Sequence, residues 1–284
     1  MGSNPIKLSY FLEKPDALHG GELAQDTYFT DGAAYERRMG RWTRAVGAIF
    51  LDWVAPPVGA RWLDIGCGTG VFTELVLDTC AAATVVAADP SAAQIAHARS
   101  KPLAARADFR VADAQTLPFP DGSFDVVASA LVINFIPDRP RALAEMCRVG
   151  CPGGLVAGYV WDFTAERTPT SPVRVGLSQV GAELRPVPGT EDSRLEALRS
   201  LFARAGLKDI ATRTIDVTMT FPDFNDFWGT QTPAYSPTGK VVASLSEADR
   251  EKLIGLLRAR LPAGPDGSIS YSARANAVKA RVPE

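Results

Sequence analysis

The stretch WLDIGCGTGVF, Trp62–Phe72, constrains the fold most, because it sets three glycines between two short apolar segments. Glycine reaches backbone conformations with positive φ and lets the chain approach another group closely. A strand that bends sharply into a helix needs this freedom at the bend. The unpaired N–H groups at the start of the helix then offer a site for a polar or anionic group. The stretch therefore predicts a strand, a tight turn and a helix, with a ligand bound at the turn.

Strand and helix patterns continue to alternate along the chain. The predicted strands are apolar on both faces, which is typical of a parallel sheet covered by helices on both sides. We expect strands at 61–65, 84–88, 109–112, 124–130 and 155–161, with helices at 71–79, 91–99 and 139–149. A helix at 34–54 precedes this series, and a helix at 194–205 and strands at 210–218 and 268–282 follow it. The chain is therefore predicted to be an α/β protein with a doubly wound sheet.

Three segments do not follow this alternation. Residues 1–33 precede the first predicted helix, residues 163–190 are rich in Thr, Pro and Gly and predict irregular structure, and residues 221–265 contain one predicted helix, at 247–260. We expect an N-terminal lid segment at 1–33 and one domain at 34–284, with lid insertions at about 163–190 and 221–265. The aromatic side chains of these parts either line a pocket for a small, partly hydrophobic molecule or form a small core of the lid itself.

Acidic residues stand at the ends of successive predicted strands, at Asp64, Asp89 and Asp113. The carboxyl ends of parallel strands meet at one edge of a sheet, where open α/β sheets bind ligands. A carboxylate at this edge accepts hydrogen bonds from ribose hydroxyls or from an ammonium group. The dinucleotide pattern Gly-x-Gly-x-x-Gly is not met, because Val71 or Thr73 stands at the third glycine position. The glycines and acids together favour a cofactor site over a merely structural turn.

The composition argues against several classes of protein. The net charge of −2 gives no basic excess of the kind that nucleic-acid binders show, and the apolar run 45–54 is too short to span a bilayer. The four cysteines have no zinc-site spacing, and no cluster of metal ligands stands out. Reduced thiols are typical of the cytoplasm. We therefore expect a cytoplasmic protein with no bound metal and no nucleic-acid or membrane partner.

Four ordered motifs carry a resemblance to a known family: LDIGCGTG, DGSFDVVASALVINFIPD, CRVGCPGGLVAG and LFARAGLKDI. From about Tyr35 to its end, the chain resembles the class I S-adenosylmethionine-dependent methyltransferases. It is most similar to their type 11 small-molecule group, which is related to the ubiquinone/menaquinone C-methylases. The resemblance implies a Rossmann-like, mostly parallel seven-stranded sheet with an antiparallel last strand. It also implies S-adenosyl-L-methionine as the cofactor and S-adenosyl-L-homocysteine as its product.

The resemblance further implies cofactor contacts from each of the motif-bearing turns. The glycine turn would hold the methionine part, the next two strand ends would hold the ribose and adenine, and the backbone at the end of the fourth strand would accept from the ammonium group. Two residues of the first helix would close over the cofactor. In chain order these contacts are Tyr35 and Arg41; Asp64, Gly66, Cys67, Gly68 and Gly70; Asp89 and Pro90; Asp113, Ala114 and Gln115; and Ser129 and Ala130.

Several of these residues also have a purely structural interpretation. Asp89 stands where a residue capping the next helix would be, and Asp113 suits a turn. Tyr35 shares a helical face with Met39 and Trp42, a pattern as typical of a core stripe as of a cofactor lid.

The resemblance implies methyl transfer by in-line displacement, for which the protein mainly aligns the reactants and excludes water. The aromatic residues outside the core sheet, and not the resemblance, favour a small, partly hydrophobic acceptor. Many relatives carry His after the fourth strand, where this chain has Asn134-Phe135, so the most obvious general base is missing. Two alternatives are a protein of this fold that binds the cofactor without methyl transfer, as a sensor or lyase, and a nicotinamide oxidoreductase of related topology. The acceptor, the methylated atom, the base and the oligomeric state stay open.

Overall fold

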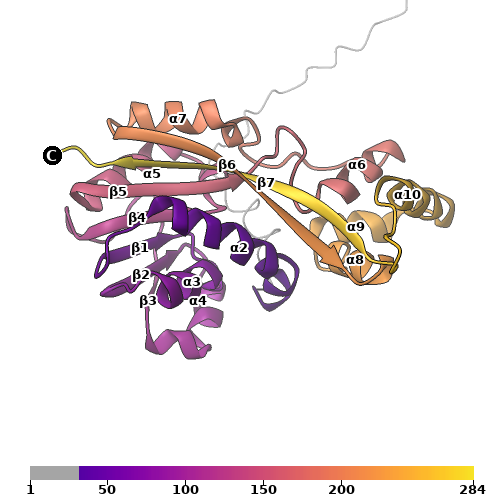
Figure 1. The fold of residues 1–284 in the computed structure, drawn as a ribbon, viewed down its shortest axis with the longest axis horizontal. Helices are drawn as coiled ribbons and strands as arrows, with labels where there is room; N and C mark the ends of the chain where they lie inside the picture. The colour runs from indigo at the N-terminus through magenta and orange to yellow at the C-terminus, as the bar shows by residue number, and fades with distance from the viewer. Residues whose placement is uncertain (1–31) are drawn as a thin grey trace, which may run out of the picture.

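A seven-stranded sheet forms the centre of the protein, in the order β3-β2-β1-β4-β5-β7-β6 (Figure 1). The structure is a computed structural model that describes residues 32–284, and before Met39 it describes the side chain of Glu36 alone. The strands are β1 (Arg61–Ile65), β2 (Thr84–Asp89), β3 (Asp108–Val111), β4 (Phe124–Ala130), β5 (Gly150–Trp161), β6 (Lys208–Phe221) and β7 (Ile269–Arg281). Strands β1 to β5 pair in parallel, and β7 is antiparallel to both β5 and β6. The predicted doubly wound sheet with an antiparallel last strand is confirmed.

Helices cover both faces of the sheet. One face carries α2 (Gly32–Val54), α3 (Val71–Thr79) and α4 (Ala92–Arg99), and the other carries α5 (Arg139–Val149) and α7 (Leu195–Arg204). In α2, Met39, Trp42, Val46 and Phe50 recur every three or four residues and are buried in one apolar cluster with residues of the sheet. This is the spacing of a single helix face. The core interpretation of the stripe is therefore confirmed for Met39 and Trp42, whereas the side chain of Tyr35 lies outside the described residues.

Helices also occupy the two segments that the sequence sets apart as insertions. They are α6 (Ser171–Gln179) in the first, and α8 (Phe224–Gln231), α9 (Pro237–Ser244) and α10 (Glu247–Arg260) in the second. They gather around the far end of the long β6–β7 pair (Figure 1). The predicted irregular structure at 163–190 is wrong for α6, because Pro172 and Gly176 hide its pattern. Pro172 lies in the first turn, where its missing N–H costs little, and a Cβ at Gly176 would lie 2.6 Å from Leu253 Cδ1 of α10.

Aromatic rings at the same end of the molecule pack on one another. Phe221 stacks on Tyr271 with ring centroids 5.7 Å apart, and Phe227 meets Phe221 edge-on at 5.6 Å. All three rings are buried. These rings therefore belong to a core and not to an open pocket wall, and that core is continuous with the apolar cluster that α2 forms with the sheet.

Short 3-10 turns complete the described part of the chain: η1 (Pro102–Ala105), η2 (Ile133–Phe135) and η3 (Glu191–Ser193). Within residues 32–284, no helix is both long enough and apolar enough to cross a membrane. The same residues contain no group of three or more His, Cys, Asp and Glu side chains placed to hold a metal ion. The predicted lid segment 1–33 lies almost wholly outside the described residues.

Candidate functional site

The sheet brings the predicted site residues to one edge. Strands β3, β2, β1 and β4 are neighbours and run parallel, so their carboxyl ends lie side by side (Figure 1). Asp64 lies in β1 and pairs in register with Ala87 of β2 and Ala128 of β4. Asp89 ends β2, and Asp113 follows β3 by two residues. The acidic positions that the sequence places at successive strand ends are therefore adjacent in the fold.

The glycine loop, residues 66–70, joins β1 to α3 with positive φ at all three glycines: 73° at Gly66, 53° at Gly68 and 85° at Gly70. The N–H groups of Gly66 and Cys67 both donate to the Ala88 carbonyl, at 2.7 and 3.1 Å, which ties the loop to β2. A Cβ at Gly66 would lie 2.5 Å from the Val132 methyls, whereas a Cβ at Gly68 would meet no atom of the described residues within 4 Å. Gly66 is thus required by packing, and Gly68 has open space beside it among the described residues.

Asp89 holds the glycine loop through its side chain. Its Oδ2 accepts from the Gly68 N–H at 2.9 Å, and its Oδ1 accepts from the Ser91 N–H at 2.8 Å. Ser91 is the residue that caps α4, so the capping role suggested for Asp89 belongs to Ser91. Burial raises the pKa of Asp89, although its two backbone hydrogen bonds oppose this. Each carboxylate oxygen keeps a further lone pair for a ligand donor.

Asp64 lies beneath the glycine loop and is 1% exposed. Its Oδ2 accepts from the Thr73 hydroxyl at 2.6 Å, while its Oδ1 is buried and has no partner among the described residues. Burial raises the pKa of Asp64 to about 7. A buried carboxylate is costly unless it is paired. The buried, unpaired oxygen therefore fits a site that receives a ligand with a cationic or hydrogen-bond-donating group.

The loop after β3 is a turn closed by Asp113. Its Oδ1 accepts from the backbone N–H and the side-chain amide of Gln115, at 2.9 and 3.0 Å. The turn interpretation of Asp113 is therefore confirmed, and it is compatible with a ligand because the side chain is exposed. Ala114 is buried, and Gln115 Oε1 accepts from the Asp138 N–H at 3.0 Å. Gln115 thus links this turn to the segment that follows β4.

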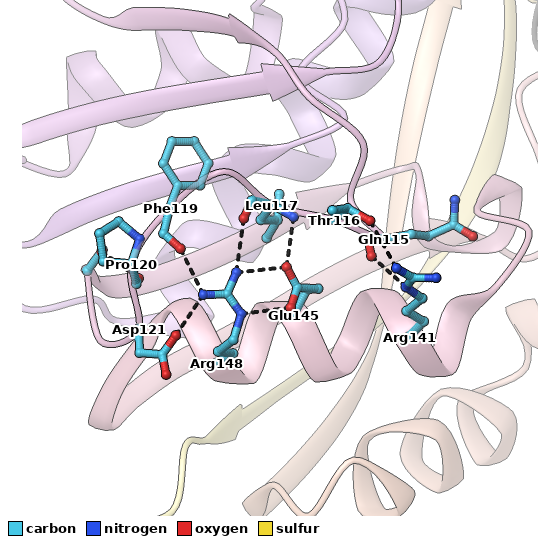
Figure 2. Close-up of polar contacts among 10 residues, drawn as sticks. Gln115, Thr116, Leu117, Phe119, Pro120, Asp121, Arg141, Glu145 and Arg148 are labelled. Atoms are coloured by element: carbon cyan, nitrogen blue, oxygen red, sulfur yellow. Dashed lines mark hydrogen bonds and ion pairs between the residues drawn. The ribbon is translucent and has the colours of Figure 1, made fainter.

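Side chains of helix α5 hydrogen-bond to the backbone of the loop that follows β3 (Figure 2). Arg141 Nε donates to the Gln115 carbonyl at 2.8 Å, and Glu145 Oε2 accepts from the Leu117 N–H at 2.7 Å. Arg148 donates to the carbonyls of Leu117 and Phe119 and pairs with Glu145 and Asp121. Its guanidinium lowers the pKa of Glu145. The loop that carries Asp113 to Gln115 is therefore held by charged side chains of one helix.

The post-β4 loop, residues 131–138, turns back over the glycine loop. Ser129 at the end of β4 is fully buried, with no partner for its hydroxyl among the described residues, and Ala130 is partly buried. Leu131 has a φ of 65°, which is rare for a residue with a side chain, and its N–H donates to the Tyr159 carbonyl at 2.7 Å. This bend sends Val132 onto Gly66.

The N-terminal helix reaches the site through residues that sequence reasoning missed. Lys101 forms an ion pair with Glu36 of α2 and donates to the Thr69 carbonyl in the glycine loop at 2.9 Å. Arg41 instead donates to the Thr220 carbonyl at 3.3 Å, and its guanidinium lies 6.0 Å from the centre of the Phe221 ring. The predicted closure of Tyr35 and Arg41 over the cofactor stays a prediction. Lys101 and Thr73 carry no motif signal, because only the fold brings them to the loop.

The comparisons with known proteins agree with this geometry. The profile of a methyltransferase domain family matches residues 63–158. The ubiquinone/menaquinone biosynthesis C-methyltransferase UbiE of Geobacter sulfurreducens is 33% identical over 174 residues, covering 55% of this chain and 67% of that protein. The demethylmenaquinone methyltransferase of Thermus thermophilus is 39% identical over 116 residues, 40% of this chain and 51% of that one. The malonyl-[acyl-carrier protein] O-methyltransferase of Serratia marcescens is 33% identical over 113 residues, 40% of this chain. This chain spans only 43% of that protein.

A solved structure shows the same fold. The phosphoethanolamine N-methyltransferase 2 of Haemonchus contortus, in complex with S-adenosyl-L-methionine, has a TM-score of 0.57 and 20% identity, covering 95% of this chain and 62% of that one. At this identity the likeness concerns the fold alone. The family follows from the sequence matches together with the seven-stranded sheet and its acid-bearing edge. The chain belongs to the class I S-adenosylmethionine-dependent methyltransferases, in the family of the type 11 methyltransferase domain.

Proposed function

We propose that this methyltransferase transfers a methyl group to a small, partly hydrophobic molecule, and that the glycine loop with its acids holds the cofactor. Two observations at one loop carry the proposal: the Cβ position of Gly68 is open among the described residues, and Asp64, in the strand that leads into the loop, has a buried oxygen with no partner among them. Glycine at such a position lets a ligand come against the backbone.

The residues at this edge suit the parts of S-adenosyl-L-methionine. Asp64, with Gly66, Cys67, Gly68 and Gly70, would hold the methionine part, and its free oxygen would accept from the ammonium group, with the backbone of Ser129 and Ala130 alongside. Asp89 keeps lone pairs for the ribose hydroxyls, and Pro90 follows it. Asp113, Ala114 and Gln115 would meet the adenine, and Tyr35 and Arg41 of α2 would close over the cofactor.

When bound, S-adenosyl-L-methionine supplies an activated methyl group on a sulfonium centre. The chain's own contribution is then to orient the acceptor and to exclude water from the reacting groups. The post-β4 loop offers Asn134 where a base would stand, and an amide does not take up a proton near neutral pH. This favours an acceptor that is nucleophilic by itself, or one deprotonated by a carboxylate, a tyrosine or water.

Apolar and aromatic surroundings support an acceptor that is partly hydrophobic. Trp161 ends β5 at the same edge of the sheet, and its ring meets that of Trp42 edge-on at 6.3 Å. The Trp161 ring N–H is buried and has no partner among the described residues. An indole N–H in an apolar wall suits one polar anchor for a small molecule. The quinone methyltransferases named above support a small-molecule acceptor, whereas another relative is named for a malonyl group on a carrier protein, so the relatives do not specify one acceptor.

Two measurements test the proposal in sequence. Titration calorimetry with S-adenosyl-L-homocysteine measures cofactor affinity for the unmodified protein and for Asp89→Ala. A screen of small metabolites with S-adenosyl-L-methionine labelled in its methyl group then looks for transfer. Binding that is weakened in Asp89→Ala, together with label on an apolar or aromatic metabolite in the screen, is the expected result. Binding without transfer across a broad panel would instead favour a cofactor-binding sensor or lyase.

A further inference from the structure

Residues 187–193, named the strap here, lie against the post-β4 loop. Asn134 of that loop is 1% exposed, and its Nδ2 donates to the Pro188 carbonyl at 3.0 Å. Gly189 approaches the same residue so closely that a Cβ there would lie 2.1 Å from the Asn134 carbonyl oxygen. The strap and the loop are 54 residues apart along the chain at this contact. Their packing is therefore a feature of the tertiary fold and not of local sequence.

Further contacts fix the rest of the strap. Arg139 forms an ion pair with Asp192 and donates to the Ile136 carbonyl of the post-β4 loop at 2.6 Å. Asn276 of β7 donates to the Ser193 carbonyl at 2.8 Å, and the Thr164 hydroxyl donates to the Thr190 carbonyl at 3.0 Å. Asn134 is thus the contact that fixes the Pro188 end of the strap, while the Ser193 end is held by the sheet.

The loop under the strap also borders the cofactor site. Val132, two residues before Asn134, packs against Gly66 of the glycine loop. Phe135, one residue after Asn134, meets the ring of Phe163 at 6.2 Å, where the first insertion begins. Asn134 therefore lies in the loop between a residue that packs on the glycine loop and a residue that contacts the first insertion.

The orientation of the Asn134 amide is set by its partner. The Pro188 carbonyl can only accept, so the NH₂ group must face it, and Oδ1 is left buried with no partner among the described residues. We propose that Asn134 is a positioning residue for the acceptor side of the reaction: it fastens the strap onto the post-β4 loop and so fixes the wall against which the acceptor lies. The role in the reaction rests on the proposed function, whereas the fastening does not.

Two variants break the same contact from opposite sides. Asn134→Asp keeps the shape of the side chain but replaces the donor with a carboxylate oxygen facing the Pro188 carbonyl. Gly189→Ala adds a methyl group where the Asn134 carbonyl lies. Gly181→Ala is the matched control, because Gly181 lies in the same insertion with a φ of 80°, against 62° for Gly189. A Cβ at Gly181 would meet nothing within 4 Å in the part of the chain that the structure describes. If Asn134→Asp does not fold, Gly189→Ala still tests the contact.

Hydrogen exchange followed by mass spectrometry, on the protein without ligand, measures how often the strap opens. We expect exchange in peptides covering 187–193 to rise about tenfold in Asn134→Asp and in Gly189→Ala relative to Gly181→Ala, as for a lost hydrogen bond with a buried partner. Equal exchange in all three variants would overturn the fastening role. This result does not depend on any cofactor or acceptor.

The effect on the reaction is measured next, on an acceptor found by the labelled-methyl screen. We expect Asn134→Asp and Gly189→Ala to raise KM for the acceptor about tenfold, while KM for S-adenosyl-L-methionine and the affinity for S-adenosyl-L-homocysteine change less than threefold. An unchanged acceptor KM, or an equal loss for cofactor and acceptor, would overturn the positioning role. A protein that neither binds S-adenosyl-L-homocysteine nor transfers methyl would refute the proposed function and leave the exchange result standing.

Discussion

Gly68→Ala separates the structural from the ligand-binding role of the glycine loop. Gly68 has a φ of 53°, and a Cβ there would meet no atom of residues 32–284 within 4 Å. Gly122 lies in the turn before β4, at the opposite edge of the sheet, with a φ of 63° and an equally open Cβ position. Gly122→Ala is therefore a matched control, because both changes force alanine into the left-handed region and neither one crowds the protein.

The magnitudes follow from the two environments. Alanine in the left-handed region costs about 1–2 kcal/mol, so both variants should lower the free energy of unfolding by that amount and remain folded. Only the methyl group at position 68 points toward the proposed cofactor. We expect it to weaken S-adenosyl-L-homocysteine binding at least tenfold, which is about 1.4 kcal/mol, while Gly122→Ala binds as the unmodified protein does. A third variant, Gly66→Ala, should cost about 1–3 kcal/mol more stability, because its Cβ would lie 2.5 Å from the Val132 methyls.

Chemical denaturation measures the stability of the three variants, and titration calorimetry measures their affinity for S-adenosyl-L-homocysteine. The reasoning is refuted if Gly68→Ala is folded and binds with undiminished affinity, because the open side of Gly68 would then not face the ligand. Equal losses of affinity in Gly68→Ala and Gly122→Ala would point to general destabilisation and would also count against the assignment.

Three further predictions concern the acids and the core. The pKa of Asp64 is raised by burial from 3.8 to about 7, so its contribution to stability is complete below about pH 4 and is lost as the pH rises through 7. The unfolding free energy of the ligand-free protein should therefore fall between pH 5 and 8 by a few kcal/mol at most, and Asp64→Asn should flatten this dependence in denaturation curves. Asp89→Ala should weaken S-adenosyl-L-homocysteine binding by about 1.5–3 kcal/mol, because hydrogen bonds to a charged group are lost. Calorimetry that gives an unchanged affinity would contradict the ribose assignment. Trp42→Ala should cost about 3–5 kcal/mol of stability, because the ring is 1% exposed and packs on Trp161 and Tyr271. A loss under 1 kcal/mol would show that Trp42 is not a core residue.

The sheet and the position of the site were predictable because their signals are local. Strands that are apolar on both faces indicate a parallel sheet, and a turn with glycines at three positions indicates where its first strand meets a helix. Asp64 and Asp89 stand directly at strand ends, so the rule that parallel strands end at one edge places them together. No contact between distant residues was needed for this step.

The contacts that complete the site were not predictable, because each joins residues far apart along the chain. The hydrogen bond from the Gly68 N–H to Asp89 spans 21 residues, and Lys101 reaches Glu36 across 65. Helix α6 was missed for another reason, because Gly176 weakens its helical pattern. Glycine is needed at this position because Leu253 of α10 packs closely against it. Helix propensity describes what a segment prefers in isolation, and tertiary packing overrides it where two helices pack closely, as α6 and α10 do.

Each loop at the carboxyl edge of the sheet is fixed by its own hydrogen bonds. This difference in attachment indicates which part of the site opens to admit a ligand. Asp89 holds the glycine loop, α5 holds the loop after β3, and the post-β4 loop is tied to β5 through the Tyr159 carbonyl. At the first turns of α2, by contrast, the described contact with the glycine loop is the one through Lys101 and Glu36, two partly exposed side chains. Ion pairs of this kind contribute about 1 kcal/mol or less. We therefore expect the start of α2 to open to admit the cofactor, while the three loops beneath it keep their shape.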